Sequence, residues 1–170
     1  MVENLRIRHY KKSDYETCYN LWVELTKYHQ EIYEDSSIGG ENLGQGFIEH
    51  LKEHGDECVW VAEIDNKIVG LIGLIVRGKA AEVEPIIVSS FYRKKGIGNK
   101  LLQFIINYAS EKDLKYLSIR PVARNKNAFK IFYEKGFNIT GHIELFMDLK
   151  NKESEKWKKG IEIHDIPLRY

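Results

Sequence analysis

The feature that most constrains the fold of this chain is a change of hydrophobic period at Gly96. Residues 80–88 alternate between apolar and polar side chains, which is typical of a β-strand. From Gly96 to about residue 112 the apolar residues recur every three to four positions, which predicts a long amphipathic helix. Because a strand runs into a helix here through a short basic turn, we expect an α/β fold.

The other elements follow the same logic along the chain. We expect further strands near residues 5–9, 58–64, 67–76, 114–121 and 143–149, and helices from a capping box at residues 13–16 to about residue 30, over 45–54 and over 125–135. Asp65 and Asn66 are typical of a tight hairpin turn, so the three strands between residues 58 and 88 should be antiparallel neighbours. Parallel pairing is expected around the Gly96 helix. The pattern predicts a mixed, mostly antiparallel sheet with helices on both faces.

Size and composition limit the organisation of the chain. With 170 residues it can form one well-filled core, which we assign to residues 1–150. Residues 151–170 are expected to be a C-terminal extension that serves as a capping strand or as a contact between the subunits of a homodimer. Lys and Arg number 26 and Asp and Glu 25, so no global field favours nucleic acid or an anionic membrane.

Several other classes of protein are disfavoured. Cys18 and Cys58 have neither the spacing of a metal knuckle nor the density of a disulfide scaffold. His50 and His54 lie one helical turn apart, but no third ligand is placed, so no metal site is expected. The chain has no signal-peptide pattern and no run approaching the roughly 20 apolar residues of a membrane span. We therefore expect a cytoplasmic protein.

The turn before the helix carries the most chemical information. Gly96 and Gly98 allow a ligand to approach the backbone, and the free amides at a helix start carry partial positive charge. Arg93, Lys94 and Lys95 add basic side chains at the same place. Together these features predict a cradle for a diphosphate. The Walker pattern and the dinucleotide-binding fingerprint are both absent from this turn.

Two motifs then resemble one known family. Residues 93–98 have the pattern Arg-x-x-Gly-x-Gly between a strand and Leu101-Leu102, and this resembles the acetyl-coenzyme A signature of the GNAT N-acetyltransferases. Asn125, Ala128 and residues 133–137 resemble the later motif of the same family. The resemblance extends over residues 5–149. It implies a GNAT-like fold, acetyl-CoA as cosubstrate and an amine as acceptor.

The resemblance also implies which residues contact the cofactor. Backbone groups of Ile86, Ile87 and Val88 would pair with the pantetheine arm as an added strand does, and the amides around Gly96 would hold the diphosphate. The full implied set is Ile86, Ile87, Val88, Arg93, Lys94, Lys95, Gly96, Ile97, Gly98, Asn99, Lys100, Asn125 and Tyr133.

Tyr133 is implied as the acid for the leaving thiolate, but it lies one position from the family's usual tyrosine. That usual position holds Phe132. A shift of one position rotates a helical side chain by about 100°.

The general base is expected on the strand before the turn, where the resemblance places it. Glu82 and Glu84 share one face of an alternating strand. Glu82, eleven residues before Arg93, is the first candidate, and Glu84, held extended beside Pro85, is the second. Pro85 cannot donate to a strand ladder, so an interruption is expected beside them. The expected reaction is transfer of acetyl to a primary amine of a small molecule or protein by direct attack in a ternary complex. The alternative is a non-catalytic CoA-binding regulatory domain.

Overall fold

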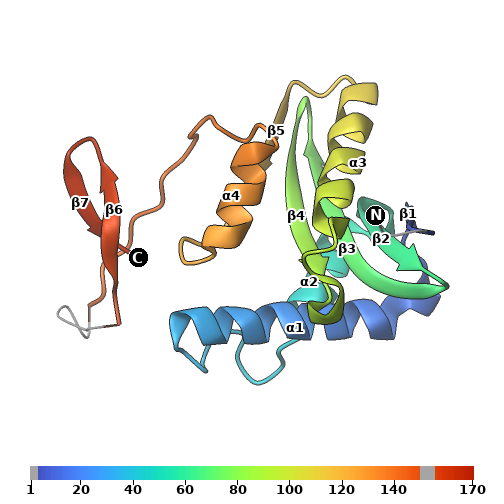
Figure 1. The fold of residues 1–170 in the computed structure, drawn as a ribbon, viewed down its shortest axis with the longest axis horizontal. Helices are drawn as coiled ribbons and strands as arrows, with labels where there is room; N and C mark the ends of the chain where they lie inside the picture. The colour runs from blue at the N-terminus through green and yellow to red at the C-terminus, as the bar shows by residue number, and fades with distance from the viewer. Residues whose placement is uncertain (1–3, 150–155) are drawn as a thin grey trace.

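The computed structural model describes residues 4–149 and 156–170. Its main sheet has five strands in the order β1-β2-β3-β4-β5 (Figure 1). These are β1 (Arg6–His9), β2 (Val59–Ile64), β3 (Lys67–Arg77), β4 (Ala80–Val88) and β5 (Tyr116–Ile119). The first four strands pair antiparallel, while β5 pairs parallel to β4. The predicted mixed and mostly antiparallel sheet is confirmed.

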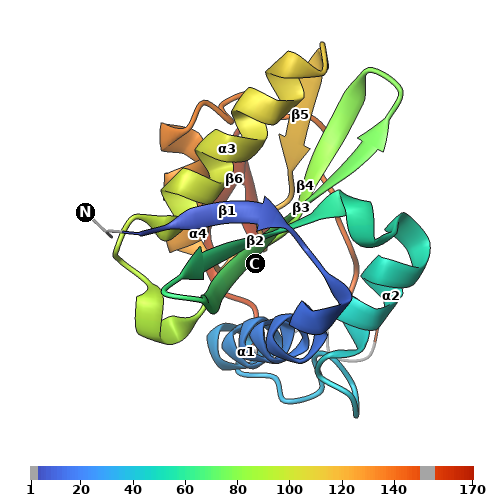
Figure 2. The ribbon, with the colours of Figure 1, turned by 90° about the vertical axis from the view of Figure 1, so that its right-hand side faces the viewer.

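Helices cover both faces of this sheet, as the sequence predicted. They are α1 (Tyr15–Tyr33), α2 (Gln45–His54), α3 (Ile97–Glu111) and α4 (Lys126–Glu134). Figure 2 shows α1 and α3 on opposite sides of the central strands. One core joins the sheet to α3 and α4, and a second joins it to α1 and α2. In β2, Trp60 and Ala62 belong to the first core, while Val59 and Val61 belong to the second. This explains the continuous apolar run of β2.

The turns of the sheet follow from local chemistry. Asp65 and Asn66 have positive φ angles of 48° and 60°, as a two-residue turn between β2 and β3 requires. The interruption expected at Pro85 is also confirmed, because the pairing of β3 with β4 shifts between Ile72 and Leu74. At this place a Cβ on Gly73 would lie 2.1 Å from the Glu84 carbonyl oxygen, so the two backbones approach too closely for any other residue.

The predicted capping box at residues 13–16 is wrong. Helix α1 begins at Tyr15, after a short 3₁₀ turn (Lys12–Asp14), and has no side-chain cap. The Asp14 carboxylate instead accepts hydrogen bonds from the Arg8 guanidinium at 2.7 Å and from the Lys11 amide at 2.8 Å. The start of the helix is therefore set by an ion pair with β1, which no local pattern reveals.

The predicted last strand at residues 143–149 is also wrong. Residues 138–149, which we call the arm, contain no strand, and a separate hairpin follows, formed by β6 (Lys159–Ile163) and β7 (Ile166–Arg169) (Figure 1). An alternating apolar pattern becomes a strand only where a neighbouring strand completes its hydrogen bonds. The arm runs from α4 to the hairpin without meeting such a neighbour among the described residues.

Candidate functional site

An open backbone edge forms where β4 and β5 separate. The two strands pair only from Ala80 with Tyr116 to Val83 with Ile119, whereas β4 continues to Val88. The Ser89 amide donates to the Val69 carbonyl at 2.9 Å, so by strand alternation the Val88 carbonyl points away from β3. The Arg93 Nε donates to this carbonyl at 3.1 Å. Residues 84–88 thus present the kind of strand edge that an extended ligand pairs with.

The glycine turn lies at the end of this edge and opens α3. Gly96 is the N-terminal cap, with a φ of +81°, and the first helical hydrogen bond runs from the Lys100 amide to the Gly96 carbonyl at 3.1 Å. The preceding amides of the first turn have no partner within the helix. A Cβ on Gly98 would have only one neighbour, Cγ2 of Val88 at 3.8 Å. The fold itself therefore does not require glycine at position 98, and the space it leaves adjoins the open edge of β4.

Basic side chains surround this cradle without ion pairs that would neutralise them in the described parts of the chain. Arg93, Lys94 and Lys95 are all exposed. The Arg93 guanidinium lies 5.1 Å from the centre of the Tyr28 ring, and Lys95 Nζ lies 4.8 Å from that of Tyr92. The cradle is therefore a local positive site in a chain of nearly zero net charge.

Glu24 on α1 anchors the segment that leads into the cradle, and sequence reasoning missed it. Its carboxylate accepts from the Ser90 amide at 2.8 Å and from the Ser89 hydroxyl at 3.3 Å. The signal was present, because Glu24 lies three residues after Leu21 and four before Tyr28, on the apolar face of the helix. A carboxylate at such a position needs a polar partner from the sheet.

The two carboxylates of β4 differ in their surroundings. Glu82 is 7% exposed, and its Oε2 lies 2.5 Å from Nη2 of Arg120, which follows β5. The hydrogen bond and charge of Glu82 raise the pKa of Arg120. Glu84 is exposed. Glu82 is therefore held in one position beside the opening between the strands, whereas Glu84 faces solvent.

Helix α4 places the residues of the second motif. The Asn125 side chain caps the helix by accepting from the Ala128 amide at 3.1 Å. Phe132 is 7% exposed and packs against Phe137, whereas Tyr133 is 61% exposed. The shift of one position thus puts a phenylalanine in the core and a tyrosine in solvent. A cofactor contact or an acid role for Tyr133 stays a prediction.

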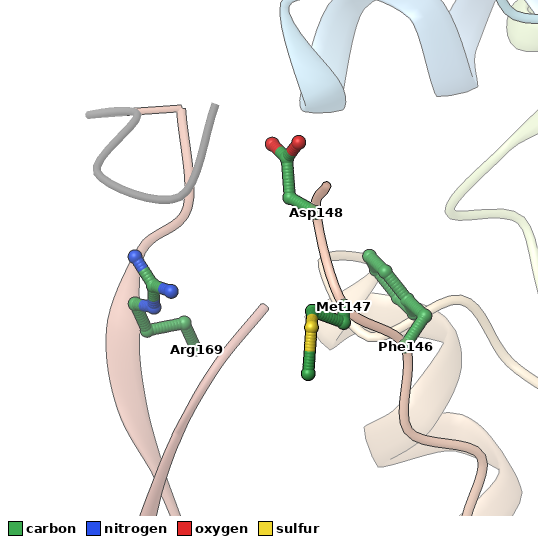
Figure 3. Close-up of a pocket in the computed structure, with 4 residues that line it drawn as sticks. All are labelled: Phe146, Met147, Asp148 and Arg169. Atoms are coloured by element: carbon green, nitrogen blue, oxygen red, sulfur yellow. The ribbon is translucent and has the colours of Figure 1, made fainter. Parts of the chain in front are cut away.

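Other features lie apart from the cradle. A cavity of about 330 Å³ is lined by Phe146, Met147, Asp148 and Arg169, between the arm and β7 (Figure 3). The buried His50 Nε2 has no hydrogen-bond partner among the described residues. Within residues 4–149 and 156–170 there is no cluster of three or more side chains suited to a metal ion, and none of the helices there combines the length and the hydropathy of a membrane span.

In this mixed sheet β4 and β5 separate, and a helix that begins at a glycine lies beside the gap between them. This arrangement defines the acyl-CoA N-acyltransferase class of folds. The chain belongs to the acetyltransferase (GNAT) family, whose model matches residues 15–138. The family named from the two sequence motifs is confirmed, and so is the fold class.

Similar proteins carry names that agree with this assignment. Human N-acetyltransferase 8 is 26% identical over 127 residues, which are 71% of this chain and 52% of the relative. The chain thus spans about half the length of that relative. A GNAT acetyltransferase from Staphylococcus aureus has a TM-score of 0.64 at 19% identity, covering 78% of this chain and 83% of its own. The Thermoplasma acidophilum PaiA N-acetyltransferase, solved with coenzyme A, has a TM-score of 0.63 at 20% identity, covering 78% and 89%.

Proposed function

We propose that this chain binds acetyl-CoA at the open edge of β4 and transfers the acetyl group to a primary amine of a small molecule or a protein. One observation carries the proposal: Gly98 adjoins the edge of β4, yet neither its φ nor its packing requires a glycine. A residue without a side chain at a helix start is needed where a phosphate approaches the backbone amides. The solved relative with bound coenzyme A supports the choice of ligand.

The residues at the opening fit this ligand in two ways. The edge of β4 near Ile86 and Val88 provides backbone groups for the two amides of the pantetheine arm. The first-turn amides of α3 and the exposed Arg93, Lys94 and Lys95 provide donors and positive charge for the diphosphate. Asn125 holds the start of α4 with its carboxamide oxygen, and its amide nitrogen is left for the ligand.

Acetyl transfer to an amine needs a proton acceptor, an oxyanion donor and a proton for the leaving thiolate. Glu82 is the proposed acceptor, directly or through water, with Glu84 as the second candidate. The C–N bond forms as the neutral amine attacks the acetyl carbonyl, and the C–S bond then breaks to release the thiol. A main-chain amide near residues 86–88 stabilises the oxyanion, and Tyr133 supplies the proton to sulfur.

We place this reaction in the cytoplasm. Cys18 and Cys58 are both free, and burial raises the pKa of the Cys18 thiol to about 12. Such a buried thiol is inert toward oxidants, and a free pair suits a reducing compartment.

Release of thiol from acetyl-CoA over a panel of small amines and lysine peptides tests the proposal. We expect Glu82→Gln to lower kcat by about 10²- to 10⁴-fold, the usual contribution of a general base, with little change in KM for acetyl-CoA. Glu49→Gln on the exposed surface of α2 is the matched control and should leave both unchanged. Full activity in both Glu82→Gln and Glu84→Gln would remove the assignment of the base.

A second candidate is a CoA-binding regulatory domain without turnover. The observation that favours it is the ion pair of Glu82 with Arg120, because this ion pair engages the carboxylate that is proposed as the general base. Calorimetry with coenzyme A distinguishes the candidates when it is combined with the thiol assay. Binding without turnover for any amine selects the regulatory domain, and absence of binding rejects both.

A further inference from the structure

The open edge of β4 ends at a carbonyl that already accepts a hydrogen bond from a side chain. The Ser89 amide donates to the Val69 carbonyl of β3, so by alternation the main-chain groups of Ile86 and Val88 face away from β3. β5 stops pairing before it reaches either residue. The Arg93 Nε donates to the Val88 carbonyl at 3.1 Å. A ligand that pairs along this edge therefore competes with Arg93 for its last carbonyl.

Helix α1 holds the Arg93 side chain in this position. The guanidinium lies 5.1 Å from the centre of the half-buried Tyr28 ring, which is a cation–π contact. One helical turn earlier, Glu24 accepts from the Ser90 amide at 2.8 Å and so fixes the segment that carries Arg93. Figure 1 shows this connection between β4 and α3 lying against α1. Arg93 thus has two partners at the edge, one on the strand and one on the helix.

The rest of the Arg93 guanidinium remains available to a ligand. Its two terminal nitrogens donate to no group in the described parts of the chain, and the side chain is exposed. Val88, its partner, adjoins the cradle, because a Cβ on Gly98 would meet Val88 Cγ2 at 3.8 Å. A diphosphate on the first-turn amides of α3 would therefore lie beside this guanidinium.

The two partners open to Arg93 differ in strength. A guanidinium binds phosphate oxygens through parallel charge-assisted hydrogen bonds, which are stronger than a single bond to a neutral carbonyl. A ligand that carries a diphosphate provides this stronger partner and so releases the Val88 carbonyl for its own pantetheine arm. A ligand that consists of the pantetheine arm alone provides no such partner and has to compete with Arg93.

We infer that Arg93, held at Val88 by Tyr28, makes this chain select acyl donors that carry a diphosphate over pantetheine thioesters that lack one. Arg93 obstructs the edge against a short donor and binds a long one, so a single side chain acts in opposite directions on the two. The inference rests on the proposed function, since it concerns the thioester donor of that reaction.

The first test measures the binding of coenzyme A and of pantetheine by calorimetry, with the parent chain and with Arg93→Met. We expect the dissociation constant for coenzyme A to rise about tenfold in Arg93→Met, because charge-assisted hydrogen bonds to the diphosphate are lost. The dissociation constant for pantetheine should fall about threefold to tenfold, because one competing hydrogen bond is removed. Lys94→Met is the matched control, since Lys94 is basic and exposed in the same turn. It should weaken coenzyme A binding and leave pantetheine binding unchanged.

The opposite directions exclude a merely structural role, because a disordered turn would weaken the binding of both ligands. A dissociation constant for pantetheine that is unchanged or higher in Arg93→Met overturns the inference, while coenzyme A binding by the parent chain leaves the proposed function standing. Absence of coenzyme A binding by the parent chain rejects the proposed function and this inference together.

The second test addresses the aromatic partner on α1. Tyr28→Phe keeps the ring that the guanidinium faces, so both dissociation constants should match those of the parent chain. Tyr28→Leu removes the ring, and the dissociation constant for pantetheine should fall about twofold to fivefold, the contribution of one exposed cation–π contact. Equal pantetheine binding by Tyr28→Leu and Tyr28→Phe overturns the part assigned to Tyr28, and thermal melts check that both variants are folded.

Discussion

Gly98 at the start of α3 lies beside Val88 at the end of β4, with room between them for a Cβ that would meet Val88 Cγ2 at 3.8 Å. The fold therefore accepts alanine at position 98, and alanine favours a helix over glycine by up to about 1 kcal/mol. We predict that Gly98→Ala keeps or slightly raises the melting temperature, while the dissociation constant for coenzyme A rises tenfold or more. Calorimetry and thermal melts measure the two effects separately.

A matched control for this variant is Asn107→Ala, which also raises helix propensity but lies on the exposed side of α3, away from the cradle. It should leave coenzyme A binding unchanged. Equal affinity of Gly98→Ala and the parent chain would show that no ligand approaches this residue.

Glu24 is predicted to position the cradle from the opposite side of the sheet. Replacing it with glutamine removes the negative charge of the carboxylate to which the Ser90 amide and the Ser89 hydroxyl both donate. Because hydrogen bonds to charged groups contribute about 1.5–3 kcal/mol, the turn should loosen, and KM for acetyl-CoA should rise with a smaller change in kcat. Glu31→Gln, exposed on the same helix, is the control. A drop in kcat alone would contradict a positioning role.

Asp14 and Asp113 each form an ion pair, and the two ion pairs have the same length. Arg8 with Asp14 and Lys79 with Asp113 are both 2.7 Å apart, but the side chain of Asp14 is 7% exposed and that of Asp113 is 88% exposed. We expect Asp14→Asn to lower the free energy of unfolding by about 2–4 kcal/mol, since it leaves the largely buried Arg8 cation with Glu63 as its remaining ion-pair partner. Asp113→Asn should cost less than about 1 kcal/mol. Urea denaturation of both variants measures the difference.

The contribution of Asp14 to the free energy of unfolding should depend on pH. Burial would raise the pKa of Asp14, but the Arg8 hydrogen bond and the Lys11 amide outweigh it and lower the pKa. Since the carboxylate is stabilised in the folded state, the contribution is present above the unfolded pKa of about 4 and is lost as the pH falls through the folded value. The difference in stability between the parent chain and Asp14→Asn should therefore shrink in acid. A constant difference would contradict this.

His50 should make the fold sensitive to mild acid. Burial, with a smaller effect of the neighbouring His54, lowers the pKa of His50 to about 4. An unfolded histidine titrates near pH 6.5. Between pH 6.5 and pH 4 the unfolded state therefore binds a proton at this histidine, and the folded state does not. We predict that His50 lowers the free energy of unfolding over this window by up to roughly 3 kcal/mol and adds no further loss below it.

His50→Leu should flatten that dependence and also remove the buried Nε2 that lacks a partner among the described residues. Its stability at pH 7 should therefore match or exceed that of the parent chain. His142→Leu, at an exposed position of the arm, is the control. An unaltered pH profile in His50→Leu would assign the acid sensitivity to other groups.

The parts of the fold that could be predicted are those governed by local periodicity. The apolar stripe of α3, the alternation of β4 and the Asp65-Asn66 turn each follow from a few neighbouring residues, and all three are confirmed. The failures have a common cause. Ser13 has the local chemistry of a cap, and residues 143–149 have that of a strand, but both depend on groups far away in the sequence.

The sequence by itself determined the family, the order of the elements as far as α4 and the glycine turn, because these rest on short-range patterns and on spacing along one strand and one helix. Only the tertiary structure decided that Glu24 reaches the segment before the cradle from α1, that Arg120 lies against Glu82, and that the arm forms no strand pair among the described residues. The physical reason is that hydrogen bonds and ion pairs between distant segments form only once packing has brought their backbones together, and no local pattern encodes that distance.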